Sequence, residues 1–69
     1  MVEAFKTNVR KKAQSKMLLY AMAELFPSFE INFDLTDRDK VLRVEGENIE
    51  ALRIMILVKE YGFKCELLD

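Results

Sequence analysis

Short stretches of the chain predict strands, and in the clearest of them apolar and polar residues alternate, as they do in strands that have one buried face. The clearest stretch is 28–35, whose apolar positions are Phe29, Ile31, Phe33 and Leu35. Turn-forming residues at 36–39 join it to a stretch at 40–45 in which Leu42 and Val44 should face inward, and the pair predicts a hairpin. Further strands are expected at 2–7 and 63–67, the second with inward residues Phe63, Cys65 and Leu67.

Two segments between these strands carry apolar residues at helical spacing. In the first, Thr7 or Asn8 is the expected N-cap, and Pro27 is expected to end the helix. The apolar residues that recur at spacing four, and that we expect to face the core, are Ala13, Met17, Ala21 and Leu25. The second helix should run from an N-cap at Asn48 to about Tyr61, with Gly62 as its C-terminal glycine.

The resulting order, βαββαβ, predicts an α+β fold of the ferredoxin-like type, in which both helices cover one face of a four-stranded antiparallel sheet. The central strands are then 2–7 and 40–45. The other sheet face is expected to be charged and to contact water. Its side chains, from the parity of each strand, are Lys6, Glu30, Asn32, Asp34, Arg43, Glu45, Lys64 and Glu66.

The length of 69 residues has room for one domain, which we place at 1–69. An apolar share of 51%, with two Gly and one Pro, indicates an ordered globular chain. A core this small leaves a net stability of only ~3–5 kcal/mol unless something adds to it. The chain has one cysteine and no histidine, which excludes an internal disulfide and a stabilising metal site of the usual type. We therefore expect oligomerisation to supply the additional stability. The lack of a disulfide framework also favours a cytoplasmic location.

Neither membrane insertion nor nucleic-acid binding is expected. No apolar run reaches the ~18 residues of a membrane span. Residues 10–26 resemble parts of a signal peptide, but Glu24 interrupts the apolar part and no small-residue cleavage site follows, so we interpret them as a core helix. RNA-recognition modules of this topology stack bases on aromatic residues of the central strands, where this chain has only Phe5, expected in the core.

The net charge of −1 hides an uneven distribution along the chain. Residues 1–23 hold five bases and one acid, whereas residues 24–69 hold six bases and eleven acids. The five N-terminal bases are Lys6, Arg10, Lys11, Lys12 and Lys16. They form either a solvated helix face or a patch that binds an acidic partner or an anion, and both interpretations stay open.

Three segments, 29–35, 41–46 and 61–66, together with Phe5 and Lys6, resemble the heavy-metal-associated domain family of copper chaperones and metal-pump N-terminal domains. The resemblance covers nearly the whole chain and implies the βαββαβ scaffold. In that family a Cys-x-x-Cys pair in the first loop binds a soft metal ion. The corresponding positions fall near Lys12 and Ser15, so the resemblance implies a degenerate member that lacks the metal motif.

Other metal-binding or catalytic groups are scarce. Cys65 is the only thiol, and its inward parity predicts an apolar role in the core rather than metal ligation. The chain has no histidine to act as a base, and the carboxylates of Asp37 and Asp39 belong to the expected hairpin turn. We therefore expect no enzyme activity, no cofactor and no bound metal.

Both helices carry more apolar residues than one sheet face can cover, since a docked helix needs an apolar stripe of only ~100°. The surplus predicts either that the helices bury more of their surface than one sheet face requires, or that the extra apolar residues form an interface. The residues expected to meet their own copies in a symmetric dimer are Ile49, Leu52 and Ile56, joined by Leu18 or Met22. The favoured function is a non-catalytic module that binds a protein partner or itself. The alternatives are a soft-metal carrier or sensor with an unconventional site, and a small-ligand regulatory domain.

Overall fold

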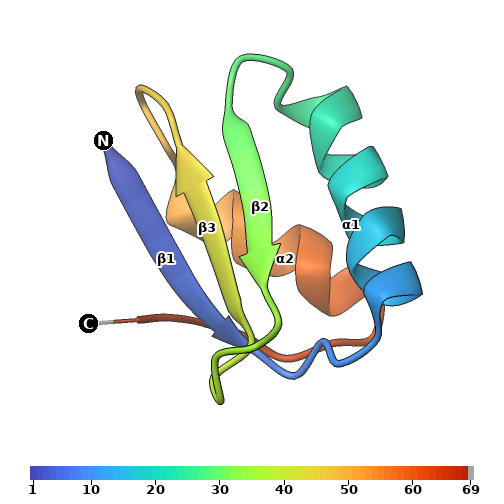
Figure 1. Ribbon diagram of the computed structural model, residues 1–69. Helices are drawn as coiled ribbons and strands as arrows, with labels where there is room; N and C mark the ends of the chain where they lie inside the picture. The colour runs from blue at the N-terminus through green and yellow to red at the C-terminus, as the bar shows by residue number, and fades with distance from the viewer. Residues whose placement is uncertain (69) are drawn as a thin grey trace.

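The computed structural model describes residues 1–68. Its elements, shown in Figure 1, are β1 (Val2–Thr7), α1 (Lys12–Leu25), β2 (Glu30–Asp34), β3 (Val41–Glu45), α2 (Ala51–Glu60) and β4 (Cys65–Leu67). The predicted order of four strands and two helices is confirmed. β2 and β4 are shorter than the alternation indicated, because turns at 27–29 and 61–62 occupy the segments that lead into them.

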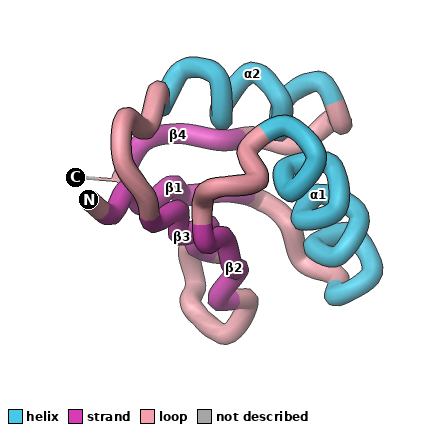
Figure 2. The backbone as a smooth tube through the Cα atoms, turned by 90° about the horizontal axis from the view of Figure 1, so that it is seen from above, coloured by secondary structure: helices cyan, strands magenta, loops and turns pink. Residues whose placement is uncertain are grey.

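The four strands form one antiparallel sheet in the order β2-β3-β1-β4, with β1 and β3 in the middle. Both helices lie on the same side of this sheet, as Figure 2 shows. α1 runs beside β2, and α2 crosses behind the sheet next to β4 (Figure 1). The arrangement is the ferredoxin-like α+β fold expected from the sequence, in which each β-α-β half returns to the same sheet.

The core lies between the sheet and the two helices. The central strands contribute Phe5, Leu42 and Val44, all fully buried. The buried apolar side chains of the helices are Leu18 and Met22 from α1 and Ile54, Leu57 and Val58 from α2. Val9 and Cys65 complete this buried cluster.

The opposite face of the sheet is charged, as predicted. The exposed residues are Lys6, Glu30, Asn32, Arg43, Glu45, Lys64 and Glu66, and Asp34 is half-buried. Thr36 donates two hydrogen bonds to Oδ1 of Asp34, from its hydroxyl at 2.6 Å and from its amide at 3.1 Å. These bonds lower the pKa of Asp34 below its usual value, so its carboxylate stays ionised at more acidic pH than an ordinary aspartate.

The core face of α1 differs from the prediction. Met17 and Leu25 are 46% and 55% exposed, whereas Ser15, Leu18 and Met22 are buried. Residues at spacing four advance by about 40° each time around a helix, so Ala13 and Met17 lie about 140° and 100° from Leu18. Leu25 lies within about 20° of Leu18 and is exposed at the last position of α1. Residues 15, 18 and 22 stay within about 60° of one another, and this narrower line is the one that packs on the sheet.

The predicted N-caps also differ. α1 begins at Lys12, and Gln14 Oε1 accepts a hydrogen bond from the amide of Lys11 at 3.2 Å. Thr7 and Asn8 instead hold the loop before α1 in place. The hydroxyl of Thr7 donates to the carbonyl of Lys40 at 2.6 Å, and Oδ1 of Asn8 accepts from the amide of Lys64 at 2.7 Å.

The start of α2 and the end of β4 also depart from the prediction. The N-cap of α2 is Glu50, and Asn48 sits in the preceding turn at φ 57°, a left-handed conformation that Asn tolerates. Gly62, at φ 91°, follows α2 as expected. In β4, Cys65 is buried, but Leu67, the last residue of this edge strand, is 43% exposed.

Gly46 follows β3 at a point where a side chain has no room. A Cβ atom there would overlap Cδ1 of Phe29 and lie 3.0 Å from Cε1 of the same ring. The ring of Phe29 in turn stacks on that of Phe26, with centroids 5.6 Å apart. The turn after β3 therefore packs directly against the segment that joins α1 to β2.

We expect Gly46→Ala to destabilise the fold, because the added methyl group must displace the ring of Phe29. The free energy of unfolding should fall by about 1–3 kcal/mol, the usual cost of overpacking, as measured by urea denaturation. In a Phe29→Leu background the same substitution should cost less, because the smaller side chain leaves room. Equal costs in the two backgrounds would contradict the steric explanation.

Candidate functional site

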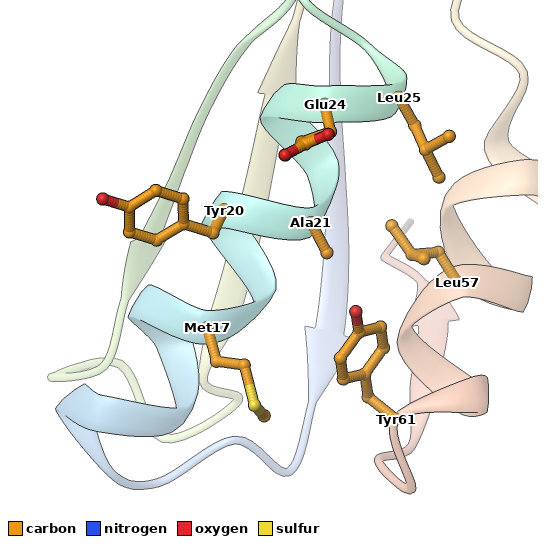
Figure 3. A pocket seen from close by; sticks show the side chains of 7 residues that line it. All are labelled: Met17, Tyr20, Ala21, Glu24, Leu25, Leu57 and Tyr61. Atoms are coloured by element: carbon orange, nitrogen blue, oxygen red, sulfur yellow. The ribbon is translucent and has the colours of Figure 1, made fainter.

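A groove of about 460 Å³ separates the exposed sides of α1 and α2. Figure 3 shows the side chains that face each other across it, which are Met17, Ala21 and Leu25 of α1, Leu57 of α2, and Tyr61 directly after α2. Glu24 lies at its border, and Tyr20 points away from α2 (Figure 3). The helices cross rather than run side by side (Figure 1), and the groove lies between them.

The apolar surface continues along α2. A hollow of about 230 Å³ shares Leu25 and Leu57 with the first groove and adds Ile56. Leu52 lies one turn before Ile56 and is 66% exposed. We call the large exposed apolar residues of this region the helix-pair surface, which consists of Met17, Leu25, Leu52, Ile56 and Tyr61.

The residues predicted for self-association separate into three groups. Leu52 and Ile56 belong to the helix-pair surface. Ile49 precedes α2, is half-buried and packs against the core. For Leu18 and Met22 the prediction is wrong, because both are fully buried on the face of α1 that packs on the sheet and cannot touch another copy.

The other side of α1 faces the edge of the sheet across a second groove, of about 470 Å³. Its apolar lining comes from Leu19 of α1 and from Phe33 and Leu35 in and after β2. Three of the five predicted N-terminal bases, Arg10, Lys12 and Lys16, line the same groove. We call it the basic groove. It combines an apolar lining with positive charge, a combination suited to a ligand that is apolar in part and acidic in part.

The remaining two bases lie elsewhere. Lys6 projects onto the charged face of the sheet, where Glu66 is its cross-strand neighbour. Lys11 is exposed at the start of α1 and does not line the basic groove. Within residues 1–68 none of the five bases forms an ion pair. The basic charge is therefore divided between two faces of the protein, and only part of it lies beside an apolar groove.

The only thiol lies inside the core. Cys65 is fully buried, and burial raises the pKa of its thiol to about 11, with a further increase from the charge of Glu66 and an opposing effect of Lys59. A thiol reacts and binds metal as the thiolate, so a neutral buried thiol is a poor nucleophile and a poor ligand. In the described part of the chain, no three His, Cys, Asp or Glu side chains are placed to hold a metal ion.

Sequence reasoning missed several groove residues because it assigned them to the core. Met17 and Leu25 belonged to the line of α1 that was expected to pack on the sheet. Leu19 lay off that line, among the surplus apolar residues of the helix, and Phe33 and Leu35 carried only the alternation of a half-buried strand. Their chemical type and spacing were visible in the sequence, but nothing in the sequence indicated that α1 would lie beside the edge of β2.

The chain was compared with models of known protein families, with curated proteins and with solved structures, and no significant match was found. Over residues 1–68, the structure has no helix of the length and apolar character needed to cross a membrane. Any functional assignment therefore depends on the two grooves and the charges around them.

The buried thiol predicts a loss of stability in alkali. Because the pKa of Cys65 is raised to about 11 in the folded state, its stabilising contribution is complete below the ordinary thiol pKa of 9.0 and is lost as the pH rises toward 11. The difference in unfolding free energy between wild type and Cys65→Ala should shrink by about 2 kcal/mol between pH 8 and pH 11. Urea denaturation at each pH measures this difference. A constant difference would contradict the elevated pKa.

Proposed function

We propose that this chain is a non-catalytic interaction module whose helix-pair surface binds a second copy of the chain. The observation that carries the proposal is the gathering of Met17, Leu25, Leu52, Ile56 and Tyr61 on one side of the molecule, each between 42% and 66% exposed. Contiguous apolar surface of this kind is uncommon on small monomeric proteins and usually marks an interface.

The charges around this surface favour a copy of the same chain as the partner. Two acids, Glu24 and Glu60, and one base, Arg53, line the grooves of the helix-pair surface. In a two-fold dimer each surface meets itself, so it needs both signs of charge to be complementary. The guanidinium of Arg53 lies 5.5 Å from the ring centre of Phe26 and 3.5 Å from Glu50, which holds it near this surface.

The size of the chain supports association as well. A typical specific interface buries ~800 Å² on each partner. That area is roughly a sixth of the 4847 Å² accessible surface of this protein. A dimer would therefore bury a substantial share of the exposed apolar side chains and add to a monomer stability that we expect to be only ~3–5 kcal/mol.

The non-catalytic role, the type of scaffold and the location in the cell are separate parts of the proposal. A non-catalytic role is supported by the lack of histidine in the chain and by the neutral, buried state of Cys65. The scaffold is proposed to be that of a degenerate heavy-metal-associated domain, on the sequence resemblance and the βαββαβ order. A free thiol without a disulfide partner supports a cytoplasmic location.

The wild-type protein should sediment as a dimer at tens of micromolar, and its melting temperature should rise with concentration. Leu52→Lys combined with Ile56→Lys should give a folded monomer. The monomer should still fold because both side chains are exposed in it. The dimer should dissociate because a two-fold interface contains both side chains twice. With ~1 kcal/mol lost for each of four side chains, the dissociation constant should rise about 1000-fold. Analytical ultracentrifugation measures the dissociation constant.

The control is Val2→Lys, which places one lysine at an exposed apolar residue of β1, away from the helices. This variant should remain a dimer. Circular dichroism should show the same helix content in all three proteins. A wild type that stays monomeric at high micromolar concentration, with a melting temperature independent of concentration, would refute the proposal.

A further inference from the structure

β2 lies at the edge of the sheet, so one of its two sides has no partner strand. Successive residues of a strand direct their N–H and C=O groups to opposite sides. The amide of Gly46 donates to the carbonyl of Met1 at 3.0 Å, in register with the pairing of β3 and β1. The even-numbered residues of β3 therefore face β1, and its odd-numbered residues face β2.

The pairing of β2 with β3 then identifies the free groups. The odd-numbered residues of β3 pair with Glu30, Asn32 and Asp34. The intervening residues, Ile31 and Phe33, direct their N–H and C=O groups away from the sheet. In the part of the chain that the structure describes, no other hydrogen bond reaches these four groups.

An apolar channel runs along this free edge. The basic groove and a neighbouring hollow of about 210 Å³ share Leu19 of α1. The hollow is lined in addition by Ala23, Phe29 and Ile31, and the basic groove by Phe33. Their lining residues on the sheet side run from Phe29 to Leu35, and β2 lies beside α1 in Figure 1. Unpaired strand groups beside an apolar groove are the features that bind extended peptides.

The charge of the channel is uneven along its length. Arg10, Lys12 and Lys16 line it together with Phe33 and Leu35, so the bases lie near the C-terminal end of β2. The acids of β2, Glu30 and Asp34, do not line the channel, although Asn32 between them lines the basic groove. A ligand in the channel therefore meets positive charge at one end and apolar side chains at the other.

We infer that this channel binds an extended peptide that adds to β2 as a fifth strand and carries acidic residues beside Arg10, Lys12 and Lys16. The backbone of the peptide pairs with the free groups of Ile31 and Phe33. Alternate apolar side chains fill the channel. Antiparallel pairing is the more stable type, and it places the acidic residues at the N-terminal end of the peptide.

A second copy of the chain fits this edge less well. If two β2 strands paired in antiparallel fashion about Asn32, Glu30 of each would lie opposite Asp34 of the other. Like charges in direct cross-strand contact are destabilising. An edge of this composition disfavours pairing with itself while remaining open to a strand of different sequence. This proposal concerns the side of α1 opposite the helix-pair surface, and it holds whether or not the protein dimerises.

The binding test uses a capped seven-residue peptide with two N-terminal aspartates followed by alternating valine and threonine, measured by calorimetry with the full chain. Binding should weaken as salt is raised, because exposed charges contribute to it. A peptide with lysine in place of aspartate should not bind measurably. Equal binding of the two peptides would overturn the proposal.

Two double variants of the protein distinguish binding in the channel from attraction by the overall positive charge. Lys12→Glu with Lys16→Glu should weaken binding of the aspartate peptide at least about tenfold, because two attractions become repulsions. Lys6→Glu with Lys11→Glu changes the net charge equally at bases outside the channel and should leave the affinity within about twofold. Equal losses in the two double variants would show that only net charge matters and would refute the proposal.

Amide hydrogen exchange tests the strand pairing directly. In the free protein the amides of Ile31 and Phe33 should exchange faster than that of Asn32, and the peptide should slow them selectively. A peptide methylated at alternate backbone nitrogens on the pairing side should lose both binding and protection. Protection of Ile31 and Phe33 that increases with protein concentration in the absence of peptide would mean that a second copy covers this edge, and would overturn the inference.

Discussion

The antiparallel pairing of β1 with β3 is the constraint on which the rest of the structure depends. Phe5 lies opposite Leu42 in this pair, and both side chains are fully buried. Because the pair forms the middle of the sheet, β2 and β4 must occupy the edges. Both helices must cover the face to which Phe5 and Leu42 point. The open edge of β2, the charged outer face and the position of α1 beside β2 all follow from this central pair.

The rotation of α1 about its axis links the core to both candidate surfaces. Packing Leu18 and Met22 onto the sheet turns Met17 toward α2 and Leu19 toward β2, and Leu25 adds to the first of these flanks from the last position of α1. The burial of one face of α1 therefore leaves apolar side chains partly exposed on both sides of that face. The flank toward α2 is bordered by charges of both signs, whereas the flank toward β2 is bordered by bases. This difference in charge is why we assign a like partner to the first and an acidic partner to the second.

The loop before α1 shows how local hydrogen bonds position functional charge. Thr7 is bonded to the hairpin at Lys40, Asn8 is bonded to the segment before β4 at Lys64, and Val9 is buried between them. The backbone up to Val9 is thus tied to two other parts of the chain. Arg10 emerges from this anchored segment, which holds it beside the channel along β2.

The sequence by itself determined the number, order and type of the elements, because alternation and helical periodicity are local properties of the backbone. It also indicated that Leu52 and Ile56 lie off the core line of α2, and that Cys65 is buried. Only the tertiary structure decided which of two apolar lines of α1 packs on the sheet, since that choice depends on β1, β3 and α2 together. The same holds for the N-terminal bases. They are close in sequence, but strand parity directs Lys6 to one face, and the docking of α1 against β2 brings Arg10, Lys12 and Lys16 to another.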